Sequence, residues 1–121
     1  MANQTDTLNH FVKAFNQHDL NKLMACFSDD AVFVSAYGPP NGQVFNGPDE
    51  IRSYFSRFFR TTRDAHFGQE SHYVNGDKGV SEWTLTGTME AGAPVRVRGC
   101  DLFTFRGDKI VRKDTFLKQT G

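Results

Sequence analysis

The chain has 121 residues and a formal net charge of zero, with 14 Lys and Arg against 14 Asp and Glu. Its length fits one domain, expected over residues 1–121, and its 38% hydrophobic residues exclude a disordered chain. We find no apolar run long enough to cross a membrane and no signal peptide, so we expect a cytoplasmic protein with no membrane partner. Two basic and six acidic groups lie in residues 1–50, and seven basic and three acidic in residues 95–121. Because no basic stripe forms, nucleic-acid binding is not expected.

The first half of the chain predicts three helices. Apolar side chains recur at helical spacing over residues 8–15, after Thr5-Asp6-Thr7, which can cap a helix start. Asp19 is predicted to be the N-cap of a second, short helix, whose apolar face extends to Phe27. A strand over residues 31–34 and a turn-rich loop over 37–42 follow. Gly47-Pro48 would open the third helix, whose apolar face spans residues 51–59.

The second half predicts four long strands, over residues 67–74, 80–89, 95–105 and 110–117. Asn75-Gly76 and the segments 91–94 and 106–109 between them are typical of hairpin turns. Helices followed by an antiparallel meander indicate an α+β fold, in which a curved sheet folds around the helices.

Asp101 is the first candidate for chemistry. Alternation along its strand places it on the same face as Val97, Gly99, Phe103 and Phe105. Burial among aromatic rings favours the protonated form of a carboxyl group, which can then act as an acid. Alternatively, Asp101 only accepts hydrogen bonds from the backbone or from a basic neighbour.

Glu82 and His66 are weaker candidates. Glu82 shares a face of its strand with three threonines, and that face either lines a polar cavity or meets solvent. His66, like His72, is either a catalytic base or a surface histidine. No set of His, Cys, Asp and Glu has metal-ligand spacing, so we expect neither a metal nor a cofactor.

Four segments carry a resemblance to a known family: FNQHDL over residues 15–20, FSDDAVF over 27–33, FNGPDEI over 45–51 and GCDLFTFRGDKI over 99–110. With them the chain resembles, over nearly its whole length, the nuclear transport factor 2-like superfamily in its SnoaL-like and ketosteroid-isomerase-like branch. The resemblance implies a cone-like α+β barrel. In it, three helices pack in the concave face of a strongly curved, mostly antiparallel sheet and leave a deep pocket. It also implies a homodimer formed through the outer sheet face.

The resemblance also assigns catalytic positions. The oxyanion-hole acid of ketosteroid isomerases falls on Asp101, but their Tyr and their base fall on Phe11 and Ser35, so that set is incomplete. The acid/base Asp of SnoaL-like cyclases also corresponds to Asp101. His66 is the nearest match to the catalytic His of scytalone-dehydratase-like members.

The Arg and two Asp of limonene-epoxide hydrolases fall on Glu82, Thr84 and Thr115, so that triad is absent. Lys113 is expected to point inward, where it can pair with Asp101 or Glu82 and favour the ionised carboxylate, or bind an anionic ligand. The implied site consists of Asp101, Glu82 and His66 as catalytic residues and Phe11, Phe33, Ser35, Tyr54, Phe55, Thr84, Val97, Lys113 and Thr115 as the pocket wall.

Three functions compete at this point. The first is a cofactor-free isomerase, cyclase or dehydratase that performs acid/base chemistry on an apolar carbonyl or ring-containing substrate, with Asp101 as the key acid. The second is a pocket that binds such a ligand without catalysis. The third is a dimeric interaction protein whose cavity is filled by its own Phe side chains.

Overall fold

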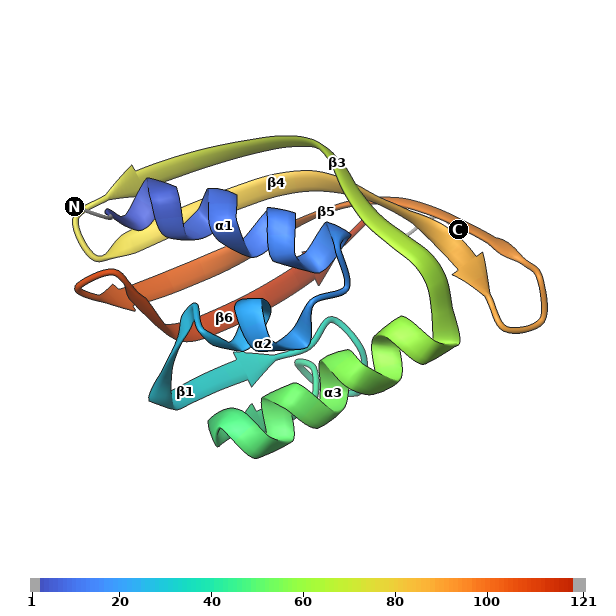
Figure 1. Cartoon of the computed structure of the whole chain (residues 1–121), viewed down its shortest axis with the longest axis horizontal. Coiled ribbons are helices and arrows are strands. Elements are labelled where there is room, and N and C mark those ends of the chain that lie inside the picture. Colours follow the sequence, from blue (N-terminus) through green and yellow to red (C-terminus); the bar gives the residue numbers. More distant parts are fainter. Residues whose placement is uncertain (1–2, 119–121) are drawn as a thin grey trace.

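The computed structural model describes residues 3–118 as helices α1 (Gln4–Asn16), α2 (Leu20–Met24) and α3 (Gly47–Thr61) with six strands. The strands are β1 (Phe27–Val34), β2 (Val44–Asn46), β3 (Thr62–Asn75), β4 (Lys78–Met89), β5 (Pro94–Arg106) and β6 (Lys109–Leu117). They form one sheet in the order β2-β1-β6-β5-β4-β3, antiparallel except where β1 runs parallel to β6. The sheet curves around the helices, with α1 lying along it (Figure 1), which confirms the predicted α+β fold.

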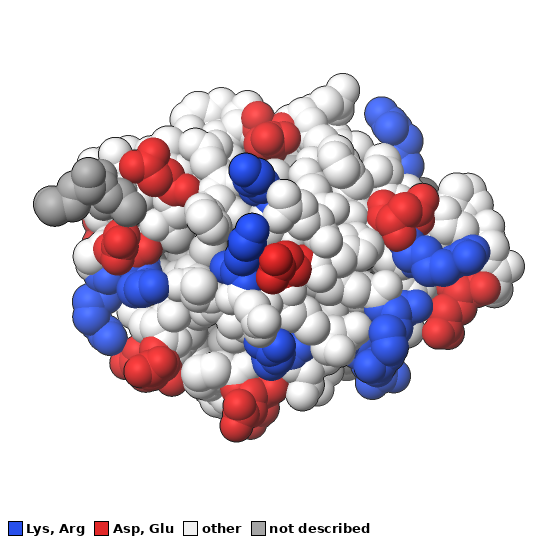
Figure 2. Space-filling model, viewed as in Figure 1, with Lys and Arg blue, Asp and Glu red and all other residues white. Residues whose placement is uncertain are grey.

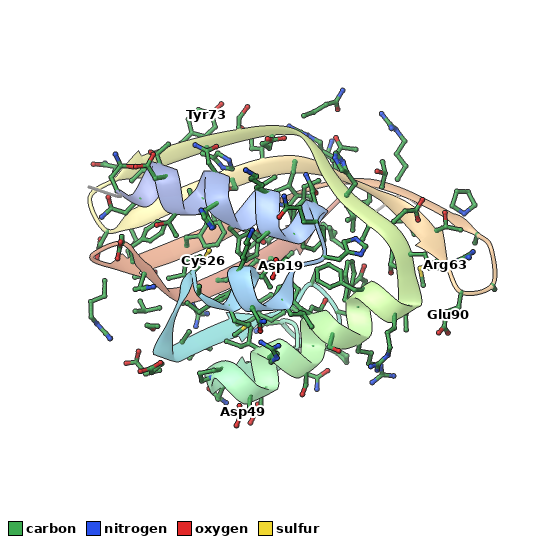
Figure 3. All side chains as sticks on the ribbon, in the orientation of Figure 1. Asp19, Cys26, Asp49, Arg63, Tyr73 and Glu90 are labelled. Atoms are coloured by element: carbon green, nitrogen blue, oxygen red, sulfur yellow. The ribbon has the colours of Figure 1, made fainter. Side chains whose placement is uncertain are left out.

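The helix starts follow from polar caps. The Asn3 side chain accepts a hydrogen bond from the Asp6 amide at 2.9 Å, and the Asp6 carboxylate accepts one from the Asn3 amide at 3.2 Å. The N-cap of α1 is therefore Asn3, which lies before the predicted capping segment Thr5-Asp6-Thr7. Asp19 caps α2 as predicted and lies at its start (Figure 3). Phe27, in contrast, begins β1 instead of extending α2, because the carbonyl of Cys26 already accepts from the Ile110 amide of β6 at 2.9 Å.

Aromatic rings fill the space between the helices and the concave face of the sheet. The Phe15 ring of α1 stacks on Phe67 of β3 with centroids 3.9 Å apart, and Phe67 stacks on Trp83 of β4 at 4.4 Å. α3 buries Ile51 and Phe55 against the same core. Within residues 3–118, no helix is long and apolar enough to cross a membrane.

A bulge in β3 decides which of its side chains face the helices. The β3–β4 register shifts between Gly68 and Ser71, around Gln69, which has a φ of 51°. Before the bulge the buried Phe67 faces inward, and after it His72 does, paired with the buried Ser81. One extra residue therefore exchanges the two faces of the strand.

We predict that Gly99→Ala in β5 lowers the free energy of unfolding by about 1–3 kcal/mol, because the added methyl overpacks the core. Its Cβ would lie 2.7 Å from the Trp83 indole and 2.6 Å from the Phe116 carbonyl oxygen. Gly68→Ala is the matched control, since its Cβ meets nothing nearer than the His66 ring at 3.7 Å. Urea unfolding measures both variants, and equal stabilities would contradict this account of Gly99.

Candidate functional site

The centre of the sheet holds a buried ion pair. Lys113 Nζ lies 2.9 Å from Asp101 Oδ1, and the two residues are 3% and 1% exposed. The register of β5 and β6 places Asp101 opposite Thr115, and Phe103 opposite Lys113, so all four side chains share the inner face. Neighbouring strands therefore bring together two charges that are 12 residues apart in the chain.

Three donors surround the Asp101 carboxylate. Oδ1 accepts from the Thr115 hydroxyl at 2.6 Å as well as from Lys113, and Oδ2 accepts from the indole N–H of Trp83 at 2.9 Å. Lys113 also donates to the Thr115 hydroxyl at 2.7 Å. Asp101 therefore accepts hydrogen bonds on both oxygens, one of them from a basic neighbour, which is the alternative that the sequence left open beside a role as acid.

The buried surroundings of Lys113 disfavour the positive charge of its ammonium group. Burial lowers the pKa of its ammonium, and the Asp101 carboxylate and the nearby Asp114 oppose that shift. Its Nζ lies 4.5 Å from the centroid of the Phe33 ring and 5.6 Å from that of Phe55. These ring faces partly replace the lost hydration by cation–π attraction.

Lys113 lies at the wall of a small inner chamber. The chamber has a volume of about 30 Å³ and adjoins an outer chamber of about 510 Å³ between α3, the loop after β1 and the ends of β4 and β5. The two chambers share Tyr37, Tyr54, Phe58 and Leu85. Burial raises the pKa of the Tyr37 and Tyr54 phenols, which keeps both neutral at ordinary pH.

The structure brings about half of the predicted pocket residues to the inner chamber. Those that line it are Phe33, Tyr54, Phe55, Lys113 and Thr115. Ser35 lines the outer chamber, where its hydroxyl donates to the Tyr37 carbonyl at 3.0 Å. Phe11 belongs to the packed core and the half-buried Val97 packs against that core, and neither residue lines a chamber. Asp101 lies behind Lys113, Thr115 and Trp83, which separate it from the inner chamber.

Three predicted site residues lie on the outer face of the sheet, so their assignment to the pocket is wrong. Glu82 is 3.7 Å from Arg98, and the Thr84 hydroxyl donates to the Gln69 side chain at 3.0 Å. His66 is exposed and pairs with Thr86 on that same face. The inner face of β4 belongs to the buried Trp83 and Leu85, because the larger apolar side chains take the core.

Sequence reasoning missed Trp83 and Tyr37, and it weighed His72 only as a catalytic base or a surface histidine. The apolar face of the β4 segment, which holds Trp83 and Leu85, was the available signal for Trp83, since a buried indole N–H needs an acceptor. His72 Nδ1 lies 2.7 Å from the Ser81 hydroxyl, while the buried Nε2 has no hydrogen-bond partner among the described residues. Burial lowers the pKa of His72, and the Glu70 and Asp101 carboxylates oppose that shift. In the described part of the chain, no group of three His, Cys, Asp or Glu side chains is placed to hold a metal.

We predict that Asp101→Asn and Lys113→Met each lower the free energy of unfolding by about 3–5 kcal/mol, because each leaves a buried charge or donor without its partner. The double variant should lose clearly less than the sum of the two. A double-mutant cycle from urea unfolding measures this coupling. Additive losses would show that the two side chains do not stabilise each other.

Comparison with known proteins identifies the family. The sequence model of the SnoaL-like domain matches residues 8–113. A candidate polyketide cyclase from Pseudomonas putida has a similar structure, with a TM-score of 0.88 at 19% identity, over 98% of this chain and 93% of that one. A protein from Catenulispora acidiphila with a ketosteroid-isomerase-like fold, solved in complex with trimethylamine, has a TM-score of 0.82 at 20% identity. That similarity covers 92% of this chain and 84% of the other.

A cystatin-like fold from Xanthomonas campestris is also similar, with a TM-score of 0.85 at 16% identity over 98% of this chain and 92% of that one. At these identities the structures establish the shared fold. No protein of curated function matches the sequence. Because the family model covers most of the chain, from α1 into β6, the protein belongs to the SnoaL-like domain family.

Proposed function

We propose that the protein binds a small carbonyl compound with an apolar ring and catalyses its isomerisation, cyclisation or dehydration by proton transfer, without a cofactor. The observation that carries this proposal is the Lys113 ammonium, which is paired with Asp101 and lines an aromatic chamber. The outer chamber falls within the range of about 300–1,000 Å³ that is typical of small-molecule sites. The inner chamber has room for about one water, which suits a carbonyl oxygen better than a ring.

Lys113 is the proton donor in this proposal. A carbonyl oxygen in the inner chamber accepts a hydrogen bond from the ammonium, which stabilises the negative charge that develops as an enol forms. After donating, the neutral amine can take a proton from the adjacent carbon. Burial favours this exchange because it lowers the pKa of Lys113 and makes the neutral amine accessible.

Asp101 then acts as a positioning residue instead of the acid. Its carboxylate fixes the lysine at 2.9 Å and supplies the balancing charge, and Thr115 and Trp83 hold the carboxylate in turn. This proposal keeps the acid/base chemistry predicted for the pocket. It differs in that Lys113, and not Asp101, carries the proton that is exchanged with the substrate.

Binding without catalysis is the second candidate. One observation favours it: among the described residues, neither chamber is lined by a carboxylate or an imidazole that could act as a separate base. In this alternative, Lys113 orients the carbonyl oxygen and the aromatic wall binds the ring.

Deuterium exchange at the α-carbon of 1-indanone in D₂O tests the catalytic proposal by NMR. Wild-type protein should accelerate exchange, and Lys113→Met should lose about 10²–10⁴-fold of that rate because the proton donor is gone. Asp101→Asn should also lower the rate, because the ammonium loses its fixed position. Lys109→Met, at the exposed first residue of β6, is the matched control and should retain the wild-type rate.

Native mass spectrometry of the same samples reports whether 1-indanone binds. Binding with no accelerated exchange would favour the non-catalytic candidate. Failure of both exchange and binding would overturn the proposed carbonyl site.

We also infer that the protein forms a homodimer through the outer face of the sheet. Leu102 and Phe116 are 44% and 49% exposed there, and the register sets them beside Val80 and Cys100. The pairs Arg98–Glu82 and Arg112–Asp114 flank this apolar patch with both signs of charge. A two-fold interface needs such a self-complementary surface. On the helix-bearing face that Figure 2 shows, by contrast, charges of both signs are spread across the surface.

We predict that Leu102→Glu converts the dimer to a monomer, because it places two like charges within an apolar contact. Light scattering after size exclusion measures the mass of each variant. Lys13→Glu, on the exposed side of α1, is the control and should remain dimeric. A monomeric wild type at micromolar concentration would contradict the inference.

A further inference from the structure

We propose that Lys113 forms a reversible imine with an aldehyde or an unhindered ketone in the inner chamber, a covalent step that rests on the proposed carbonyl-binding function. The juxtaposition that supports it is a primary amine in a chamber walled by aromatic rings, with a carboxylate and a hydroxyl within hydrogen-bond distance of the nitrogen.

Lys113 differs from every other lysine of the chain in its surroundings. The other five, all within the described residues, are exposed, whereas Lys113 is 3% exposed and lines a chamber walled by aromatic rings. An exposed lysine is almost entirely protonated at neutral pH and is therefore a poor nucleophile. Burial in an apolar pocket is the usual way in which a protein activates a lysine toward carbonyl carbon.

The pair with Asp101 allows the proton transfers that an imine requires. The ammonium first passes one proton to the Asp101 carboxylate across the 2.9 Å contact, which leaves two neutral groups in a region that disfavours charge. The free amine nitrogen then adds to the carbonyl carbon, forming the C–N bond as the C=O π bond breaks. The carbonyl oxygen takes up the proton that Asp101 received, which passes through the Thr115 hydroxyl, a group 2.6 Å from Asp101 Oδ1 at the wall of the inner chamber.

Loss of water completes the step. The carbinolamine oxygen leaves with two hydrogens in total, and the nitrogen keeps one hydrogen as a protonated imine. The sum is one ammonium and one carbonyl converted to one iminium and one water, with no oxidant or reductant. The nitrogen is positively charged before and after, so Asp101 faces the same charge in both states and the buried pair stays neutral overall.

The two chambers set the chemical class of the ligand. An inner chamber of about 30 Å³ admits a carbonyl group with little substitution, so the reactive carbon must be at the edge of the molecule. The aromatic walls around Phe33, Tyr54 and Phe58 favour an apolar body. A neutral aldehyde or methyl ketone with a ring a few bonds from the carbonyl meets both conditions.

Reductive trapping tests the proposal with 3-phenylpropanal as the probe. The intact protein is incubated at neutral pH with the aldehyde and sodium cyanoborohydride, which reduces an imine to a stable amine, and the modified lysine is located by peptide mass spectrometry. We expect Lys113 to be alkylated at least about tenfold faster than the exposed Lys109, because the chamber holds the aldehyde beside the amine. Burial also lowers the pKa of Lys113 and thereby favours its neutral, nucleophilic form. Equal or slower labelling of Lys113 in the folded protein would overturn the proposal.

Wild-type protein separates this step from the proposed function. If it binds 1-indanone and accelerates its exchange but yields no trapped adduct at Lys113, the imine is wrong and the proposed function stands. Lys113→Arg is the control for the trapping itself: arginine keeps a cation beside Asp101 but forms no imine under these conditions, so the variant should yield no adduct at position 113. If wild type neither binds 1-indanone nor traps 3-phenylpropanal, both are wrong. Thermal unfolding confirms that the variant is folded. The comparison of Lys113 with Lys109 within wild-type protein does not depend on any variant.

Discussion

The buried pair of Lys113 and Asp101 is the constraint on which the interior depends. An isolated charge in such a core is strongly unfavourable, so each group requires the other. Two supporting donors, the Trp83 indole and the Thr115 hydroxyl, also bind the carboxylate. The four residues come from β4, β5 and β6, so their contacts link the three strands in one register.

Gly99 shows how far that constraint extends. The Trp83 ring reaches Asp101 by lying over the backbone of β5 at Gly99, where a Cβ would be 2.7 Å from the indole. Phe67 stacks on the same indole, and Phe15 of α1 stacks on Phe67. A continuous stack thus connects the helix layer to the ion pair, so helix packing and the position of the charged group are coupled.

Much of the fold could be predicted from the sequence because its signals are local. The periodicity of α3, the Asp19 cap and the glycine-containing hairpin turns each lie within a few residues. The faces of the strands could not all be assigned in this way. Extended back from Val74 without interruption, the alternation that places His72 inward would also place His66 inward, but the bulge at Gln69 reverses it.

The candidate site was harder to predict for a related reason. Glu82 and Thr84 were expected in the pocket through a family resemblance, yet Trp83 and Leu85 bury far more apolar surface and take the inner face of β4. The pairing of Lys113 with Asp101 was one of the alternatives left open by the sequence. Only the β5–β6 register, which sets Thr115 opposite Asp101, brings the lysine into contact with it.

The pairing changes what the pocket can do. A lone buried carboxyl group would present a neutral acid, whereas this pocket presents a cation and keeps the carboxylate behind it. In surroundings of low polarity, a cation stabilises an oxygen that gains negative charge more strongly than it would in water. The Asp101 carboxylate weakens this electrostatic effect of the cation. It also provides a nearby site for the proton that the lysine releases. With a carbonyl compound bound as proposed, Lys113 would alternate between ammonium and amine although, among the described residues, neither chamber is lined by a carboxylate or an imidazole. The aromatic lining would then exclude water that competes for the carbonyl oxygen.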